Sequence, residues 1–317
     1  MQIRRWQPGD AAALDALYGD VFGAEARDAF VRRRRWQYLD NPWAAKPALF
    51  VAAAGDRLVG QTGGLPVPLR LGGAPVAAAW GADTMVHPDW RRRGIAAALV
   101  EAWADAGDHA LGLGLGPAPA QQALLVGRGY RVVGAVTGLA GAIDGPAGPP
   151  GVEVAGLDLA DPAIDALWER VAPGYGALVA RDGVWLRWRY AAAPWPRYAV
   201  FGARRGGALV GWSAARLTPR MGSTALLVDW LCAPDDGEVL DALVAHLRAW
   251  GRARGAAAVF AFASEARAVA RLTTAGLRAR PEFATPLLVG GSHAAMASAP
   301  IERWHLTLGD SDKDRGP

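Results

Sequence analysis

The sequence predicts an α/β protein with mixed sheets, organised as two similar domains in tandem. Segments with strand and helix patterns alternate along the chain, and several short motifs recur in the same order after about 150 residues. The 317 residues suit two domains, and the 52% of hydrophobic residues can bury a sizeable core in each.

The first half predicts one strand, two helices, a run of strands, and then helix, strand, helix and strand. A helix begins after Asp10, and the next helical segment stops before Pro42, because the residue before proline disfavours the helical region. Glycine pairs and Gly-Asp steps mark the turns between strands. The expected strands are 3–6, 49–54, 58–64, 66–71, 76–86, 110–115 and 130–136, and the expected helices are 11–22, 30–38, 95–103 and 121–127.

Four motifs of this half recur in the second half. Each match alone is weak, but together they are collinear with a nearly constant offset, which indicates an internal duplication. The matches are Ala13–Tyr18 with Ala163–Trp168, Trp36 and Tyr38 with Trp188 and Tyr190, Leu58–Gly60 with Leu209–Gly211, and Asp83 and Pro88 with Asp229 and Pro234.

A Gly/Pro-rich stretch at 144–151 cannot hold a regular element and predicts a linker between domains 1–143 and 152–317. The second domain is expected to end in a strand-like run at 301–308. A polar tail from Asp310 to Asp314 follows, which we expect to be solvated.

Composition excludes several classes of protein. The net charge of +4 suits a phosphorylated ligand, but it is too small for a nucleic-acid protein and no basic–aromatic stripe is present. The single cysteine, Cys232, permits no intramolecular disulfide, and the five scattered histidines predict no metal site. The N-terminus lacks the apolar core of a signal peptide and no segment is long enough for a membrane helix, so a cytoplasmic protein is expected.

The most informative stretch runs from Asp83 to Ala96, where a strand ends, the chain turns at Pro88 and a helix opens. The spacing Arg91-x-x-Gly94-x-Ala96 places small residues at the start of that helix. Successive backbone N–H groups can then converge on an anion, and the helix adds unpaired donors and the positive end of its dipole. The arginines can balance the charge of a diphosphate.

These residues resemble the acyl-CoA loop of the GNAT acyltransferase superfamily, and the element order of the first half is similar to that of a GNAT domain. The resemblance implies two GNAT-like domains in tandem and acetyl-CoA as co-substrate. It implies that the pyrophosphate is bound by Arg91, Arg92, Arg93, Gly94, Ile95 and Ala96.

The two halves are not equivalent at this loop. After Pro234 the second half carries Asp235, Asp236 and Glu238 and no Gly-x-Ala turn. Carboxylates at that place would repel a diphosphate by several kilocalories per mole in a partly buried site. We therefore expect only the first half to bind CoA, and the second to complete the acceptor pocket or support the first.

The resemblance also implies direct attack of an amine on the acetyl thioester, with the main-chain groups of Met85 and Val86 pairing with pantetheine and the thioester oxygen. Asp83 lies two residues before Met85, so their side chains should share a face. A carboxylate there can take the amine proton directly or through water. The alternative is a structural role, which the matching Asp229 of the half without the loop favours.

The general acid is missing. Many GNAT enzymes carry a tyrosine five residues before the aromatic of a Gly-aromatic pair, and here the pair Gly129-Tyr130 places Leu125 at that position. The run Arg32 to Arg35 is expected to be a solvated helix face, with contact to CoA or an acidic acceptor as the alternative.

The leading hypothesis is an acetyl-CoA-dependent N-acyltransferase acting on a small-molecule or amino-sugar acceptor, as a monomer or homodimer. A non-catalytic CoA-binding or sensing protein is the alternative from another class. Transfer of a longer acyl group, or acylation of a hydroxyl, is a third possibility. Nothing in the sequence selects the acceptor.

Overall fold

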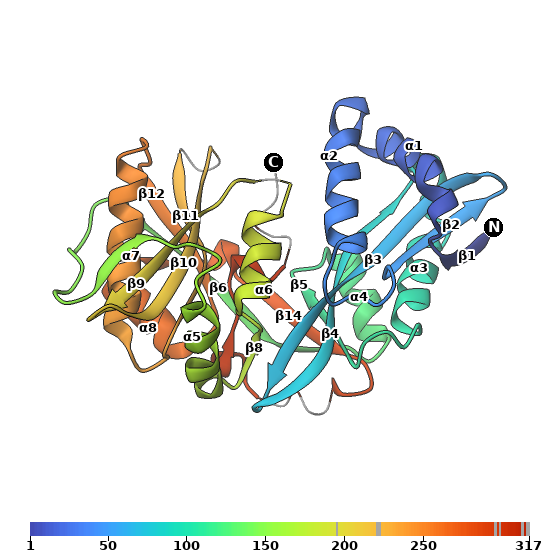
Figure 1. The fold of residues 1–317 in the computed structure, drawn as a ribbon. Helices are drawn as coiled ribbons and strands as arrows, with labels where there is room; N and C mark the ends of the chain where they lie inside the picture. The colour runs from blue at the N-terminus through green and yellow to red at the C-terminus, as the bar shows by residue number, and fades with distance from the viewer. Residues whose placement is uncertain (195, 220–222, 295–296, 298, 312–313, 315–317) are drawn as a thin grey trace. The chain divides into compact units, whose positions relative to one another are not determined.

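The computed structural model describes all residues except 195, 220–222, 295–296, 298, 312–313 and 315–317 (Figure 1). The chain divides into two compact units. Unit 1 holds Met1–Pro68, Val76–Arg131 and a segment that starts at Leu288; unit 2 holds Leu69–Pro75, Val132–Leu287 and the C-terminal end. A mixed α/β fold is confirmed.

The sheet of unit 1 has the strand order β1-β2-β3-β4-β5-β14. The pairs β1–β2 and β2–β3 are antiparallel, whereas β4 and β5 are parallel. The strands are β1 (Gln2–Arg5), β2 (Leu49–Ala54), β3 (Arg57–Leu71), β4 (Ala74–Val86), β5 (Leu111–Leu115) and β14 (Thr285–Gly290), and the helices are α1 (Ala11–Phe22), α2 (Ala24–Arg34), α3 (Ile95–Ala104) and α4 (Pro119–Gly127).

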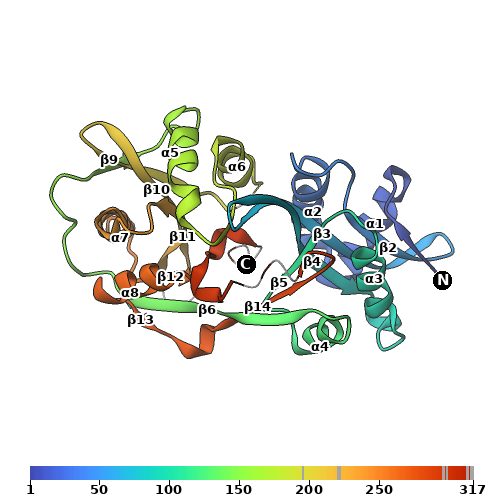
Figure 2. The same cartoon turned by 90° about the horizontal axis from the view of Figure 1, so that it is seen from below.

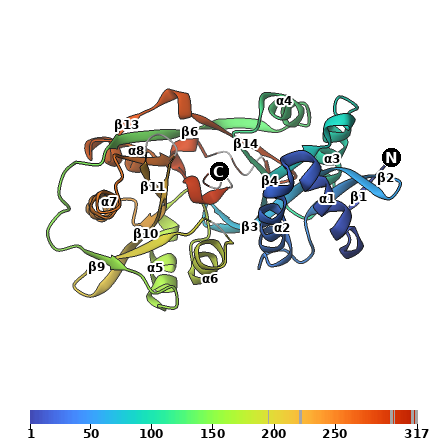
Figure 3. The same ribbon diagram turned by 90° about the horizontal axis from the view of Figure 1, so that it is seen from above.

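Helices cover both faces of this sheet because successive side chains of a strand point to opposite faces. Leu49 and Val51 of β2 pack in one cluster with α1, and the intervening Phe50 packs in another with α3 and α4. Figures 2 and 3 show α1 and α2 on one side of the sheet and α3 and α4 on the other.

The sheet of unit 2 has the order β7-β9-β10-β11-β12-β6, with β11 and β12 parallel and the neighbouring pairs antiparallel. Its strands are β6 (Arg131–Ala142), β7 (Glu153–Gly156), β8 (Ala177–Val179), β9 (Ala199–Arg205), β10 (Ala208–Thr218), β11 (Thr224–Cys232), β12 (Ala258–Ala263), β13 (Arg278–Ala279) and β15 (Trp304–His305). Its helices are α5 (Ala163–Val171), α6 (Gly183–Leu186), α7 (Gly237–Arg252) and α8 (Ala266–Thr274). The core lies between the sheet and the pair α7 and α8.

The compact units differ from the domains 1–143 and 152–317 that the sequence predicts. Residues 132–142 of β6 come before the predicted linker, yet they belong to unit 2 and pair with β12. In the opposite direction, Leu288 comes from the second half and is fully buried in the core of unit 1 with Leu125 and Tyr130. The two halves therefore exchange strands. Residues 144–151 form no helix or strand, and they lie within unit 2.

The C-terminal segment also differs from expectation. Instead of a strand over 301–308, Ile301–Arg303 forms a 3₁₀ turn and only Trp304–His305 is extended and paired, with β8. The tail is not solvated where it is described: Asp310 and Asp314 are buried and form ion pairs with Arg181 and Arg189.

Candidate functional site

The predicted loop joins β4 to α3 in unit 1. Val86 ends the strand, Pro88–Trp90 forms a 3₁₀ turn, and Ile95 begins the helix. Gly94 caps the helix with φ at 76°, a left-handed conformation that glycine adopts without strain. The N–H groups of the first turn of α3 have no partner within the helix, so they are donors for an anion placed at Gly94.

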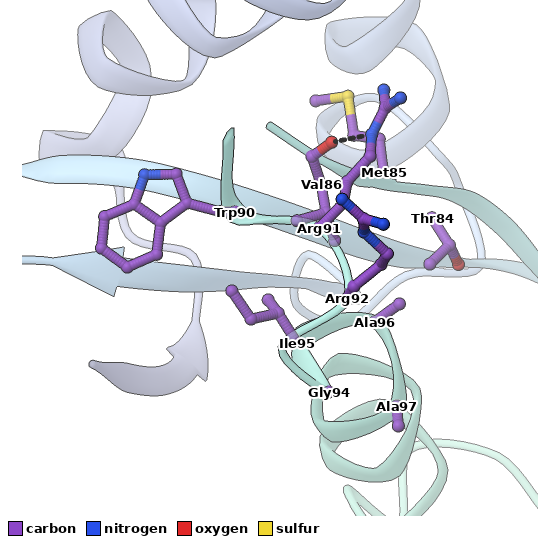
Figure 4. Close-up of a pocket in the computed structure, with 10 residues that line it drawn as sticks. All are labelled: Thr84, Met85, Val86, Trp90, Arg91, Arg92, Gly94, Ile95, Ala96 and Ala97. Carbon is purple, nitrogen blue, oxygen red and sulfur yellow. Dashed lines mark hydrogen bonds between the residues drawn. The ribbon is translucent and has the colours of Figure 1, made fainter. Parts of the chain in front are cut away.

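A cavity of about 360 Å³ opens at this loop (Figure 4). It contains seven of the eight residues that the sequence predicts for the cofactor and adds Thr84, Trp90 and Ala97. Its full lining is Thr84, Met85, Val86, Trp90, Arg91, Arg92, Gly94, Ile95, Ala96 and Ala97. The eighth, Arg93, is not in that lining: its guanidinium donates to the carbonyl of Asp89 at 2.9 Å and lies over the ring of Trp90.

The arginines of the loop have different partners. Arg91 Nε donates to the carbonyl oxygen of Val86 at 3.1 Å, which ties the loop to the end of β4 (Figure 4). Arg92 has φ at 62°, an unusual conformation for a residue with a side chain. Three positively charged side chains thus follow one another beside the start of α3.

The main-chain groups of Met85 and Val86 point in opposite directions. His87 N–H donates to the carbonyl of Val59 in β3 at 2.9 Å. Backbone groups alternate sides along a strand, so those of Val86 point away from β3 and those of Met85 point toward it. The Val86 N–H is therefore the better placed of the two to meet a ligand in the cavity.

The sheet opens beside these groups. Within the described part of the chain, β4 pairs with β5 over Ala78–Trp80 only, although β4 continues to Val86. Six residues of β4 therefore extend beyond the last pair with β5. The backbone of this end of β4 on the side of β5 is therefore open to a ligand.

Asp83 has a left-handed backbone conformation in this part of β4, with φ at 54°. One carboxylate oxygen accepts from Arg33 at 2.7 Å and the other from the Tyr38 hydroxyl at 2.8 Å. The Asp83 side chain thus lies on the α1 and α2 face with that of Met85, as the sequence predicts. Burial, followed by the charge of Asp83, raises the pKa of Tyr38 well above its usual range, so Tyr38 stays protonated and donates.

The interpretation of Arg32 to Arg35 as a solvated helix face is correct for Arg32 and Arg35, which are exposed, and wrong for the two residues between them. Arg33 points inward to Asp83, and Arg34 is buried, pairs with Asp15 and lies over the ring of Tyr18. Successive residues of a helix point in directions about 100° apart, so four in a row cannot share one face.

Unit 2 contains the same aspartate–tyrosine pair. Asp229 of β11 accepts from Tyr190 at 2.7 Å and from Arg181 at 3.0 Å, and all three side chains are buried. Tyr190 lies in a second π-helical turn, Arg187–Ala191. The duplicated tyrosines and aspartates of the sequence are therefore partners in space.

In unit 2 the opening beside this aspartate is filled by the chain itself. The pairing of β11 with β12 ends at Leu227. His305 Nε2 donates to the carbonyl of Trp230 at 2.8 Å, and Ser264 Oγ bonds the backbone on either side of His305. The Tyr175 hydroxyl donates to the carbonyl of Cys232, at the position of Val86 in unit 1. The residues that the structure describes directly after β11, 233–236, include no arginine.

The position of the missing acid is apolar. Leu125 of α4 is buried in the core of unit 1. Tyr130 is also buried, which raises its pKa to about 12, and its hydroxyl lies against the backbone of Gly112. One turn before Leu125, however, Gln121 Nε2 donates to Thr84 Oγ1 at 3.3 Å. Neither Gln121 nor Thr84 is predicted as a site residue by the sequence.

The residues that the structure describes hold no cluster of histidine, cysteine, aspartate and glutamate that could bind a metal ion. In the same part of the chain, no helix combines the length and the apolar character needed to cross a membrane.

Residues 2–106 match the family of the acetyltransferase (GNAT) domain. The chain carries a GNAT domain. No curated protein sequence matches the chain. Solved GNAT structures resemble it over most of its length. The GCN5-related N-acetyltransferase from Anabaena variabilis is 15% identical over 93% of this chain and 74% of that chain, with a TM-score of 0.71.

A GCN5-related N-acetyltransferase from Kribbella flavida is 17% identical over 91% of this chain and 70% of its own, with a TM-score of 0.67. N-myristoyltransferase from Saccharomyces cerevisiae, solved with myristoyl-CoA, is 10% identical over 91% of this chain and 82% of that chain, with a TM-score of 0.59. At these identities the likeness concerns the fold. It extends the GNAT fold well beyond residues 2–106.

Proposed function

We propose that this protein is an N-acyltransferase that moves an acetyl group from acetyl-CoA to the amine of a small-molecule or amino-sugar acceptor. The observation that carries the proposal is the cavity at the opening of β4 and β5, which ends at the left-handed Gly94 and the start of α3. Membership of residues 2–106 in the GNAT family supports acyl transfer from acyl-CoA as the general reaction.

The residues of the loop fit the diphosphate of acetyl-CoA. The unpaired N–H groups of Ile95 and Ala96 point out of the helix start, and the guanidinium groups of Arg91, Arg92 and Arg93 supply positive charge. A Cβ on Gly94 would meet no atom within 4 Å, so an anion can approach this backbone closely. Acetyl-CoA supplies an activated acetyl thioester when it is bound.

The chain then supplies an oxyanion donor and a proton acceptor. The Val86 N–H, directed away from β3, hydrogen-bonds the thioester oxygen as negative charge develops on it. The Asp83 carboxylate takes the amine proton, directly or through water. Arg33 and Tyr38 already bond its two oxygens, so proton transfer to Asp83 competes with these contacts.

The second candidate function is a CoA-binding protein without turnover. Two observations favour it: Leu125 replaces the usual acid, and Asp229 has the same tyrosine partner as Asp83 in a unit without the loop. In this alternative the Asp83–Tyr38 pair has a structural role in β4. Bound acyl-CoA then stabilises the protein or is the ligand that the protein senses.

Release of free thiol from acetyl-CoA separates the two candidates. The purified protein is incubated with acetyl-CoA and a panel of amines, amino sugars and aminoglycosides, and thiol is measured over time. Amine-dependent release that the double variant Arg91→Ala, Gly94→Glu lacks supports transfer. Binding of acetyl-CoA without release for any amine supports the binding protein.

Unit 2 is proposed to bind no CoA. Asp235 and Asp236 stand where the arginines of unit 1 stand, and His305 and Tyr175 occupy the carbonyl groups at the opening of β11. A diphosphate would meet negative charge there, and a pantetheine arm would have to displace the chain. One CoA per chain is the expected stoichiometry.

A further inference from the structure

Thr84 is the polar side chain of the cavity nearest to Asp83 in sequence, and it lies at the end of the lining farthest along β4 from the loop. CoA is a linear molecule, so its sulfur lies far from its diphosphate. With the diphosphate at Gly94, the sulfur is directed along β4, past Val86 and toward Thr84. Thr84 is about 7 Å from Val86, at about 3.3 Å per strand residue.

The side chains of Thr84 and Asp83 lie on opposite faces of the sheet. Val86 packs with α3 and α4, and Thr84, two residues earlier, shares that face. The contact from Gln121 of α4 agrees with this placement. Asp83 points instead to Tyr38 and the α1 and α2 face. The adduct of an amine and a thioester between them can therefore lose the amine proton on one side and the thiolate on the other.

The hydrogen bonds of Thr84 orient its hydroxyl. Gln121 Nε2 donates to Thr84 Oγ1 at 3.3 Å, and Thr62 Oγ1 lies 2.7 Å from the same oxygen. A hydroxyl accepts at two lone pairs and donates one hydrogen. When the buried Thr62 also donates to Thr84, both lone pairs are used and the Thr84 hydrogen is available to a third group.

We propose that the Thr84 hydroxyl, positioned by Thr62 and Gln121, donates a hydrogen bond to the departing CoA thiolate and takes the place of the missing tyrosine. This inference rests on the proposed function. The amine lone pair forms the C–N bond, the C–S bonding pair leaves with sulfur, and the amine proton passes to Asp83 or water. Thr84 keeps its own proton and stabilises the sulfur anion. Thr84 is thus a catalytic residue, and Gln121 and Thr62 are positioning residues.

The test measures the thiol of bound CoA as well as activity. The pKa of that thiol is followed by thiolate absorbance during a pH titration of the CoA complex. We compare the wild type with Thr84→Val, which keeps the shape and removes the donor, and Thr84→Ser, which restores the donor. Thr62→Val removes one positioning contact and leaves the Thr84 hydroxyl, so it separates the effect of positioning from the effect of the donor.

Thr84→Val is expected to raise the pKa of the bound thiol and to lower kcat by about 10- to 100-fold, the loss of one hydrogen bond to a charged group. The affinity for desulfo-CoA is expected to stay unchanged, and Thr84→Ser is expected to stay near the wild type in both readouts. Thr62→Val is expected to shift both readouts in the direction of Thr84→Val, but by less. If Thr84→Val leaves the thiol pKa and kcat unchanged while the wild type binds and turns over acetyl-CoA, the role of Thr84 is wrong and the proposed function stands. If the wild type does not bind CoA, both proposals fail.

Discussion

Asp83 and Asp229 are equivalent residues with different surroundings. Each is held by a tyrosine from a π-helical turn, Tyr38 or Tyr190, and each also bonds an arginine. Asp229 is fully buried, whereas the side chain of Asp83 is 15% exposed. The tyrosine and arginine contacts are shared by both aspartates, and only Asp83 is exposed enough for the proton exchange that we propose.

Asp83→Asn tests that role. General-base catalysis contributes about 10²- to 10⁴-fold, so kcat is expected to fall by at least about 100-fold, while acetyl-CoA affinity changes little. The measurement is the pH–rate profile with a reactive amine, compared with Tyr38→Phe, which leaves the carboxylate. A variant with an unchanged profile and only a lower melting temperature would show a structural role.

Gly94 is the residue whose left-handed backbone sets the conformation of the loop at the start of α3. At φ of 76° a side chain is strained, although nothing lies within 4 Å of its Cβ position. Gly94→Ala is therefore expected to lower the free energy of unfolding by about 1–2 kcal/mol without a steric clash. Denaturant unfolding checks this value, with Gly9→Ala as control because that glycine also has open space. An unchanged stability for Gly94→Ala would mean that the loop relaxes to another conformation.

Among the elements, the two units differ at the opening that lies at the end of a parallel strand pair. In unit 1 it leads to the cavity at β4, and in unit 2 it is filled by the segment around β15. Burial, and then Arg181, lowers the pKa of His305 in this segment to about 3, and its Nε2 must carry a proton to donate to Trp230. The ring is therefore neutral in the folded protein.

This neutral histidine predicts a pH dependence of stability. In the unfolded chain His305 takes up a proton near its ordinary pKa of about 6.5. The contribution of His305 to the free energy of unfolding is therefore complete above that pH. The contribution is lost as the pH falls toward 3, by up to about 1.4 kcal/mol per pH unit. Asp310 has the opposite effect, because burial raises its pKa to about 6 and its contribution is lost as the pH rises to that value.

Comparison of the wild type with His305→Gln isolates the histidine, since glutamine can still donate to Trp230. The difference in unfolding free energy between them is expected to shift in favour of the variant as the pH falls from 6.5 to 4. Denaturant unfolding at several pH values measures it. A difference that does not change with pH would contradict a buried neutral His305.

The sequence predicts these elements unevenly. The loop from Arg91 to Ala96 carries its own signal, because glycine and helix-start chemistry depend on neighbouring residues. The partners of Asp83 carry no such local signal, since Arg33 and Tyr38 lie 50 and 45 residues away and Tyr38 belongs to a π-helical turn. The duplicated Trp and Tyr motif was the only sign of that contact.

For the whole molecule, the exchange of strands between the halves is the feature that the sequence does not predict. The local pattern predicts a strand at 130–136, where β6 begins, but the choice of sheet depends on partners more than 100 residues away. A tandem repeat suggests that each half closes its own sheet. The structure instead places β6 beside β12 and buries Leu288 in the core of unit 1.

A fragment of residues 1–143 is therefore expected not to fold alone. It lacks Leu288, so Leu125 and Tyr130 lose a fully buried neighbour, and its β6 has no sheet to join. Circular dichroism and thermal unfolding of this fragment, with and without co-expressed 144–317, measure the effect. A cooperative transition for the isolated fragment would contradict the exchange.

The central claim is that acetyl-CoA binds at the loop of unit 1. Isothermal titration calorimetry of the intact protein, the Arg91→Ala, Gly94→Glu double variant and an Asp235→Ala control in unit 2 tests it most directly, with folding checked by circular dichroism. We predict micromolar binding of one acetyl-CoA by the intact protein and the control, and none by the folded double variant. Absence of binding to the intact protein, or an unchanged affinity in the double variant, would contradict the claim.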